Sequence, residues 1–429
     1  MSDLRTAVVR LDKRTAEVVT PDGDLRWESI GAALNLALIE RYGAESLVFG
    51  GGPLTGTLAP ASALLVGSFV SAWPARADRS APATSTRHVP LLLTAGPDFR
   101  FSGIDHLVLL GAAERPTLLH IDGGRVRFVE LPPQAADMPS LENLLRRSAP
   151  PFRSAILTSP AADAGVHFAS ASLGLKGSLD KAGLAGAMAA KNLKGILLGG
   201  SGGIAFVAED LKRSLELVAK LKGERKKTGG FVSVVEAAGG GDCLKVLKGA
   251  KLRDAACFHC PAPCMVHAQF AGADPRVPPG PKQQNGLLLL DHMGWIALAK
   301  RRGKGALSLL AESIRLGLDP SAVASLLPAE GGKEGLTSDF AVLFDLAKGA
   351  GPSPSMSSAA ADLTFGVSPL VPGTGEEACR RTALAFVLGV CPLFLLRFPQ
   401  ISGDLAAFLP AGVEPACVKR SAERVITQG

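Results

Sequence analysis

Short apolar runs alternate with polar turns over the first 130 residues, a pattern typical of a β-rich segment. Residues 7–11 and 16–19 flank a polar turn and predict a hairpin, and residues 117–121 and 125–131 predict another. Among these strands, apolar residues at helical spacing predict one helix over residues 30–42. Because hairpins outnumber strand–helix–strand units, the pattern favours mainly antiparallel sheet.

The hydrophobic period lengthens in the second half of the chain. From Asp210, a predicted helix cap, one helix face is formed by Leu211, Leu215, Val218 and Leu221. The sequence therefore predicts an α+β fold, with a β-rich N-terminal domain over residues 1–205 and a mainly helical region over residues 206–429. Further helices are predicted over residues 307–316, 321–327, 382–394 and 415–426, and a loop over 349–363.

Composition narrows the classes of function. The chain has 429 residues, of which 47% are hydrophobic and 20% charged, so it can bury a large core and a face against a partner. The net charge of +7 is spread over the whole length. No dense Lys/Arg tract with interleaved aromatic residues is present, which excludes nucleic-acid binding from the interpretation. A basic surface instead suits an acidic redox partner.

Neither a leader nor a membrane span is predicted. The first residues lack the apolar core of a signal peptide. The longest apolar run, residues 382–396, is shorter than the roughly 20 residues that a spanning helix needs. We therefore expect a cytoplasmic protein without a transmembrane segment. In that reducing compartment, seven cysteines favour metal or catalytic use over disulfides.

Three cysteines form a C-x₂-C-x₃-C run, after which the chain is expected to become apolar and helical. Cys257, Cys260 and Cys264 supply three thiolates from one loop, which suits one face of a [4Fe–4S] cluster. The fourth ligand must come from elsewhere, and Cys391, followed by Pro392, is the best candidate. The remaining cysteines are expected to be small core residues: Cys243, Cys379 and Cys417.

Two alternatives to a cluster stay open. Zinc also takes thiolate and imidazole ligands, and His259 and His267 lie in or near the cysteine run. A structural disulfide, or buried free thiols, is the other alternative. If a cluster is bound, the two histidines are candidates to tune it through hydrogen bonds.

Two glycine-rich turns follow predicted strands. Residues 50–57 and residues 200–205 both place glycines where exposed backbone N–H groups could hold a phosphate. The second turn fits the relaxed nucleotide fingerprint G-x-G-x-x-A, but the following residues predict more strand instead of the helix that the fingerprint needs. A tight sheet corner is the preferred interpretation of the first turn, and a nucleotide site is disfavoured at the second.

Several short motifs occur in a constant order along nearly the whole chain. Residues 52–60 read GPLTGTLAP, residues 99–105 read FRFSGID and residues 190–195 read AKNLKG. With the cysteine run and the helical segment 404–426, this set resembles the aldehyde:ferredoxin oxidoreductase family. The resemblance implies a tungsten, sometimes molybdenum, bis-pterin beside one [4Fe–4S] cluster, and it places the cluster ligands at Cys257, Cys260, Cys264 and Cys391.

Three positions depart from the family pattern. The family has an arginine between the pterin and the cluster where this sequence has Leu64. Its two Asp-x-x-Gly-Leu elements hold the pterin; Gly317 and Gly389 match the glycines, but Ile314 and Phe386 replace the acidic residues. A pterin offers polar groups and phosphates that need acceptors and cations, which aliphatic and aromatic side chains do not supply. We therefore expect a kept cluster site and a lost pterin site.

Three functions follow from these expectations. The first is an electron-transfer subunit with a [4Fe–4S] cluster and no pterin, passing electrons between a catalytic paralogue and a ferredoxin-like protein. The second is an active tungsten- or molybdenum-pterin aldehyde oxidoreductase, which would use the Asp-x-x-Gly run of residues 291–294. The third is a zinc-stabilised interaction protein. The first is preferred, and no catalytic residue is assigned.

Overall fold

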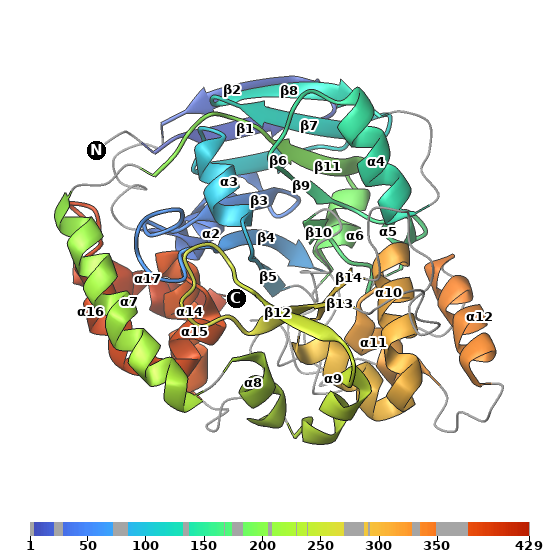
Figure 1. The fold of residues 1–429 in the computed structure, drawn as a ribbon. Coiled ribbons are helices and arrows are strands. Elements are labelled where there is room, and N and C mark those ends of the chain that lie inside the picture. The colour runs from blue at the N-terminus through green and yellow to red at the C-terminus, as the bar shows by residue number, and fades with distance from the viewer. Residues whose placement is uncertain are drawn as a thin grey trace.

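Figure 1 shows the computed structural model of the chain, in which the N-terminal strands form stacked sheets and the later segments are mostly helices. The structure describes residues 4–20, 29–71, 85–131, 137–166, 168–173, 183–204, 208–228, 230–237, 239–269, 287–290, 292–327, 335–348 and 376–428.

The first sheet has six strands in the order β2-β1-β6-β3-β4-β5. The predicted hairpin is confirmed, because β1 and β2 pair antiparallel. However, β1 also pairs in parallel with β6, after a connection of about 95 residues. The strands are β1 (Thr6–Arg10), β2 (Thr15–Val19), β3 (Leu47–Gly51), β4 (Leu65–Ser71), β5 (Ser85–Leu91) and β6 (His106–Leu110).

The second sheet has five strands in the order β10-β9-β11-β7-β8. Here too a predicted hairpin forms, between β7 and β8, while β7 pairs in parallel with β11. Both sheets are therefore mixed, and the expectation of mainly antiparallel sheet missed these long-range pairings. The strands are β7 (Thr117–Asp122), β8 (Arg125–Glu130), β9 (Ser154–Leu157), β10 (Ser172–Leu173) and β11 (Leu193–Leu198).

The two sheets share one core between them, and a helix covers the outer face of each. Side chains alternate along β1: Ala7 and Val9 face the shared core, while Val8 packs with α2 (Ala32–Tyr42). On the second sheet, Leu118 packs with α4 (Met138–Ser148) on the outer face. Central strands such as β6 and β9 are nearly continuous apolar runs because both of their faces are buried, whereas the edge strands β2 and β8 are largely exposed.

The second half is mainly helical, as expected for an α+β chain. One small sheet interrupts it, formed by β12 (Lys251–Ala255), β13 (Met265–Gln269) and β14 (Leu287–Leu290). Its larger helices are α7 (Ala208–Thr228), α9 (His292–Arg302), α10 (Ala306–Leu316), α12 (Gly335–Ala347), α14 (Glu376–Leu388) and α17 (Pro415–Gln428). Its shorter helices are α8 (Phe231–Ala237), α11 (Pro320–Leu326), α15 (Pro392–Arg397) and α16 (Ser402–Ala406).

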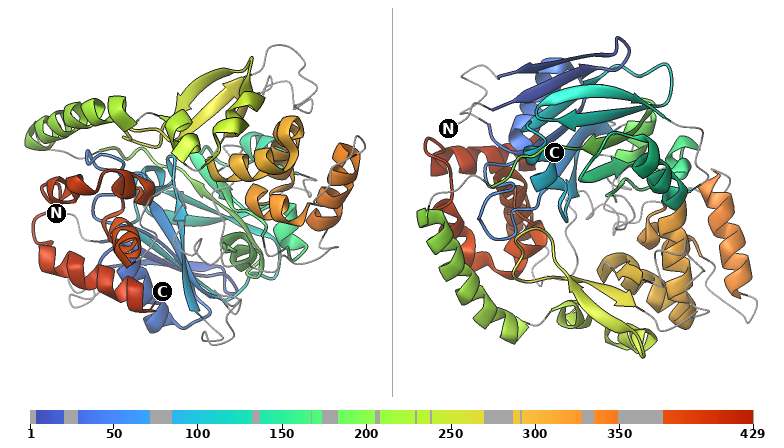
Figure 2. Two further views of the ribbon diagram at one scale, coloured as in Figure 1. Left: turned by 90° about the horizontal axis from the view of Figure 1, so that it is seen from below. Right: turned by 45° about the horizontal axis from the view of Figure 1, so that its top comes forward.

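The C-terminal helices return to the N-terminal sheet. Figures 1 and 2 show α14, α15 and α17, coloured red, beside the blue strands. Arg424 of α17 donates to Ser29 Oγ over 2.9 Å and to the carboxylate of Glu40. This return carries Cys391 back towards the first sheet.

Two local predictions were wrong. The chain after the cysteine run forms strand β13, not a helix. On α7, Leu221 is buried as predicted, but Leu211 and Leu215 are exposed (39% and 62%). The buried side is completed by Ser214 and Leu217. The loop expected over 349–363 lies outside the described residues.

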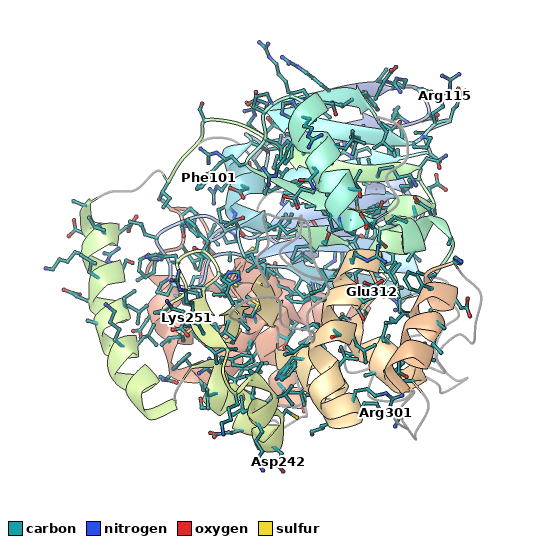
Figure 3. All side chains as sticks on the ribbon, turned by 45° about the vertical axis from the view of Figure 1, so that its right-hand side comes forward. Phe101, Arg115, Asp242, Lys251, Arg301 and Glu312 are labelled. Carbon is teal, nitrogen blue, oxygen red and sulfur yellow. The ribbon has the colours of Figure 1, made fainter. Side chains whose placement is uncertain are left out.

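The surface is charged, and the described helices do not span a membrane. Arg115 and Asp242 point outward from the body in Figure 3. Within the described part of the chain, no helix has both the length and the apolar content needed to cross a bilayer.

Candidate metal centre

The structure brings the four predicted cysteines to one pocket. Cys257, Cys260 and Cys264 line it from the loop between β12 and β13, and Cys391 lines it from the start of α15. Apolar side chains, among them Leu393 and Phe394, and the guanidinium of Arg397 complete the wall. Loop and helix are more than 120 residues apart in sequence, so only the tertiary fold makes this arrangement.

Backbone hydrogen bonds tie the cysteine loop to the N-terminal sheet. Ala61 N donates to His259 O over 2.9 Å, and Cys391 N donates to Ala61 O over the same distance. Phe258 N donates to Leu93 O over 2.8 Å. One short segment after β3 thus holds both cysteine-bearing segments, which fixes the spacing of the thiols.

The start of α15 sets the position of Cys391. Cys391 is the extended N-cap residue of this helix, and Pro392 occupies the first turn. Proline suits that place because its fixed φ fits the helix and its missing N–H would have no partner there. The predicted helix over 382–394 is in fact two helices, since α14 ends at Leu388.

All seven cysteines are described, and all are free thiols. Burial raises the pKa of Cys257 well above its usual range, and charge on the other three cysteines raises it further. Burial likewise raises the pKa of Cys264 and Cys391, while the charge of Arg397 opposes it. Two buried thiols, Cys257 and Cys391, and two half-buried thiols, Cys260 and Cys264, form a donor set that suits a soft, cationic guest, because bound metal replaces the protons.

The histidines and the other cysteines do not line this pocket. His259 Nδ1 is 3.2 Å from Ala59 O, and its Nε2 is 3.5 Å from Ser214 Oγ on α7. His267 lies on β13, beyond the last cysteine of the run. The other cysteines are Cys243 and Cys417, which are buried in apolar clusters, and Cys379, which is half-buried on α14.

Arg397 is a residue of the pocket that the sequence reasoning missed. It donates to Ala262 O over 3.3 Å, and its positive charge acts on Cys264 and Cys391. One sequence feature could have identified Arg397: it is the first positively charged residue after the longest apolar run of the chain.

The side chains at the three positions that depart from the family pattern all make apolar contacts in the fold. Leu64 and Phe386 are fully buried and belong to one hydrophobic cluster with Cys391. Ile314 is half-buried and packs against the main core. The alternative acidic residue of the 291–294 run, Asp291, lies outside the described residues. In the described part of the chain, no group of three or more His, Cys, Asp or Glu side chains is placed so that it could hold a metal ion.

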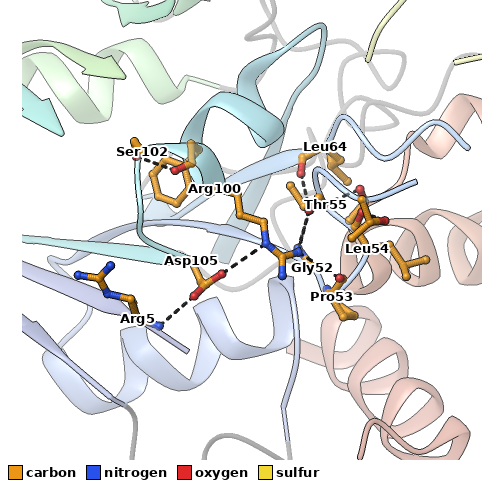
Figure 4. A network of polar contacts seen from close by, with 12 residues as sticks. Arg5, Gly52, Pro53, Leu54, Thr55, Leu64, Arg100, Ser102 and Asp105 are labelled. Atoms are coloured by element: carbon orange, nitrogen blue, oxygen red, sulfur yellow. Dashed lines mark hydrogen bonds and ion pairs between the residues drawn. The ribbon is translucent and has the colours of Figure 1, made fainter. Parts of the chain in front are cut away.

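Both glycine-rich turns have packing roles. A Cβ at Gly200 or Gly202 would lie 2.5 Å from Phe101 O, so these glycines allow the turn to lie on the end of α3 (Ala95–Phe101). At the first turn, Thr55 Oγ1 accepts from Gly52 N and donates to Leu64 O, both over 2.9 Å (Figure 4). This side chain closes the turn that continues into the Ala61 segment.

The stacked mixed sheets and the helical region define an α+β chain with an oxidoreductase-like fold. Residues 6–200 match the family model described as "Aldehyde ferredoxin oxidoreductase, N-terminal domain". Residues 6–200 therefore form the N-terminal domain of the aldehyde ferredoxin oxidoreductase family, which confirms the resemblance over this part of the chain.

Among solved structures, the fold is similar to the active-site complex BamBC of benzoyl coenzyme A reductase in complex with 1,5-dienoyl-CoA. The TM-score is 0.59 and the identity 14%; the match covers 97% of this chain and 64% of that one. At this identity the likeness is one of fold. The chain spans less than two thirds of the length of that neighbour. No curated protein matches.

Proposed function

We propose that this chain is an aldehyde:ferredoxin oxidoreductase-like [4Fe–4S] subunit that transfers electrons and binds no pterin. The observation that carries the proposal is the single pocket lined by Cys257, Cys260, Cys264 and Cys391. A cube needs one thiolate at each of four irons, and its ligands stand further apart than the ligands of a single ion. The four cysteines that line the pocket match that number of ligands.

In this proposal the chain's own residues hold and insulate the cluster. The four cysteines would give up their protons and bind it. The Ala61 segment, through its backbone hydrogen bonds, would hold the cysteine loop and the start of α15 at a fixed distance from each other. When bound, the cluster supplies one-electron transfer. Leu393 and Phe394 exclude water from the site, and Arg397 offsets part of its negative charge.

The absence of a pterin is proposed from the side chains at the family's pterin positions. Leu64 and Phe386 offer no acceptor or cation, and both are already packed in a core. Opening that core to admit a polar ring would expose apolar surface and leave polar groups without partners. The chain would therefore relay electrons for a catalytic partner.

The side of the molecule nearest the cysteine loop suits a protein partner. Ser214 of α7 contacts His259 of the loop, and the outer side of the same helix exposes Leu211 and Leu215 beside Lys212 and Lys222. Apolar contact flanked by two exposed lysines fits a small acidic electron carrier, such as a ferredoxin-like protein. Leu215→Asp is expected to slow electron exchange with that carrier and leave the iron content unchanged.

Metal analysis of anaerobically purified protein tests the proposal. About four iron and four sulfide per chain, without tungsten or molybdenum, is the expected result. Stoichiometric tungsten or molybdenum would instead support an active pterin enzyme. Zinc alone would support an interaction protein, and a chain that binds no metal under reconstitution with iron and sulfide would overturn all three.

A further inference from the structure

A second pocket lies on the other side of the Thr55 turn, away from the cysteines. Its cavity volume is about 90 Å³, so it suits a compact molecule. Segments far apart in sequence build it: the start of α2, the turn after β3, the end of α3, the start of β6 and the segment before α17. Its apolar wall is formed by Leu4, Ile30, Leu34, Phe99, Pro410 and Val413.

His106 gives this pocket a buried polar group of defined character. The residue is 1% exposed, and its Nδ1 lies 3.0 Å from Asn35 Oδ1. Asn35 donates through Nδ2 to Val66 O over 3.1 Å and to Ser68 Oγ over 2.9 Å, so its Oδ1 must be the acceptor. His106 Nδ1 therefore carries the proton, and Nε2 presents a lone pair that has no partner among the described residues.

A glycine in the strand next to His106 leaves space for the hydrogen-bonded pair of His106 and Asn35. Gly50 lies directly opposite His106 in the sheet. A Cβ at Gly50 would lie 2.1 Å from His106 Nδ1 and 2.3 Å from Asn35 Oδ1. The first glycine of the turn is thus explained by the histidine–asparagine pair and not by a bound phosphate.

Charges at the rim nearly cancel. Arg100 Nη1 donates to Pro53 O over 3.3 Å and to Thr55 O over 2.8 Å, and its Nε lies 3.9 Å from Asp105 Oδ1 (Figure 4). The positive charge of Arg100 and the negative charge of Asp105 therefore cancel at the pocket. Burial lowers the pKa of His106 to about 4, against the opposing effect of Asp105, so the ring is neutral near pH 7.

We propose that this pocket binds a small, neutral, apolar molecule that carries a hydroxyl group, such as a phenol or a compact alcohol. The hydroxyl would donate to His106 Nε2, and the apolar body would pack between Leu34 and Phe99. An anion gains little beside Asp105, and a hydrocarbon leaves the Nε2 lone pair without a partner. This site is independent of the metal centre and of the function proposed for it.

Ligand titration of the full chain tests the assignment. Phenol, toluene and benzoate share a ring and differ only in the donor and the charge, and their binding is followed by ligand-observed NMR and calorimetry. We expect phenol to bind about tenfold more tightly than toluene, because one hydrogen bond contributes about that much to affinity. We also expect phenol to bind more tightly than benzoate. Equal affinity for phenol and toluene, preference for benzoate, or no binding of phenol would overturn the proposal.

Matched variants locate the site. His106→Leu should reduce phenol binding to the level of toluene, whereas His120→Leu, at a second buried histidine outside the pocket, should leave it unchanged. Val413→Trp fills the mouth without touching the sheet and should abolish binding of both phenol and toluene, so it tests the pocket even if His106→Leu misfolds. Undiminished phenol binding in His106→Leu or Val413→Trp would place the site elsewhere.

Discussion

Two neighbouring regions share one scaffold and differ in what their side chains can bind. The cysteine pocket keeps a full set of soft donors, while the region of Leu64 and Phe386, only a few residues away along the same segments, is packed with apolar side chains. Both regions use the same backbone frame: Cys391 N donates to Ala61 O, and Leu54 N donates to Leu388 O. A frame of backbone hydrogen bonds can persist while the side chains that it carries change from ligands to core.

The strongest way to break this comparison is to remove the distant thiol. Cys391→Ala is expected to abolish iron binding almost completely, because three thiolates leave one corner of the cube without a ligand. Iron and sulfide analysis together with the visible absorption spectrum measures the effect. Cys417→Ala is the matched control, since Cys417 is equally buried and lies outside the pocket. Full iron content in Cys391→Ala would show that another group is the fourth ligand.

Restoring an acidic residue in the apolar region tests the other half of the comparison. Phe386→Asp should cost roughly 5 kcal/mol of unfolding free energy, because it removes a buried ring and places a carboxylate in a core. Denaturant unfolding measures the loss. Phe344→Asp, at a phenylalanine that is 41% exposed, should cost much less. A small loss for Phe386→Asp, or uptake of a pterin, would mean that the region is still a polar cleft.

Acid is expected to weaken the apolar region specifically. His88 lies with its ring centroid 6.4 Å from that of Phe386, and burial lowers its pKa from 6.5 to about 4. The unfolded chain therefore binds more protons between these pH values, so stability is full above pH 6.5 and falls towards pH 4. The shift corresponds to roughly 3 kcal/mol for this group. Unfolding curves of His88→Phe should show a shallower pH slope than those of the parent chain, and an unchanged slope would contradict the assignment.

The smallest expected effect concerns the charge beside the thiols. Arg397→Leu should lower the reduction potential of a bound cluster by several tens of millivolts, because a cation stabilises the more negative reduced form. A shift of about 59 mV corresponds to a tenfold change in the equilibrium constant of a one-electron reduction. Arg397→Lys should keep most of the potential. Potentiometry followed by electron paramagnetic resonance measures both, with Arg424→Leu on α17 as the control. An unchanged potential in Arg397→Leu would remove this residue from the site.

Periodicity along the chain was sufficient to predict several elements. The hairpin of β1 and β2, the helix α2 and the helix α10 were expected near the bounds that the structure has. It was insufficient for α7, where Leu211 and Leu215 satisfy the helical period yet face outward. A period identifies the faces of a helix, but the neighbouring elements decide which face is buried.

The sequence by itself determined the local elements and the α+β class, because these depend on residues close together in the chain. It also named all four candidate thiols: three form one short run, and Cys391 was added from its following proline and from the family resemblance. Only the tertiary structure decided the parallel pairing of β1 with β6, the approach of Cys391 and Arg397 to the cysteine loop, and the pocket around His106. These features join segments that are about 100 to 400 residues apart. Their positions follow from the packing of whole sheets and helices, which no local pattern of polar and apolar residues encodes.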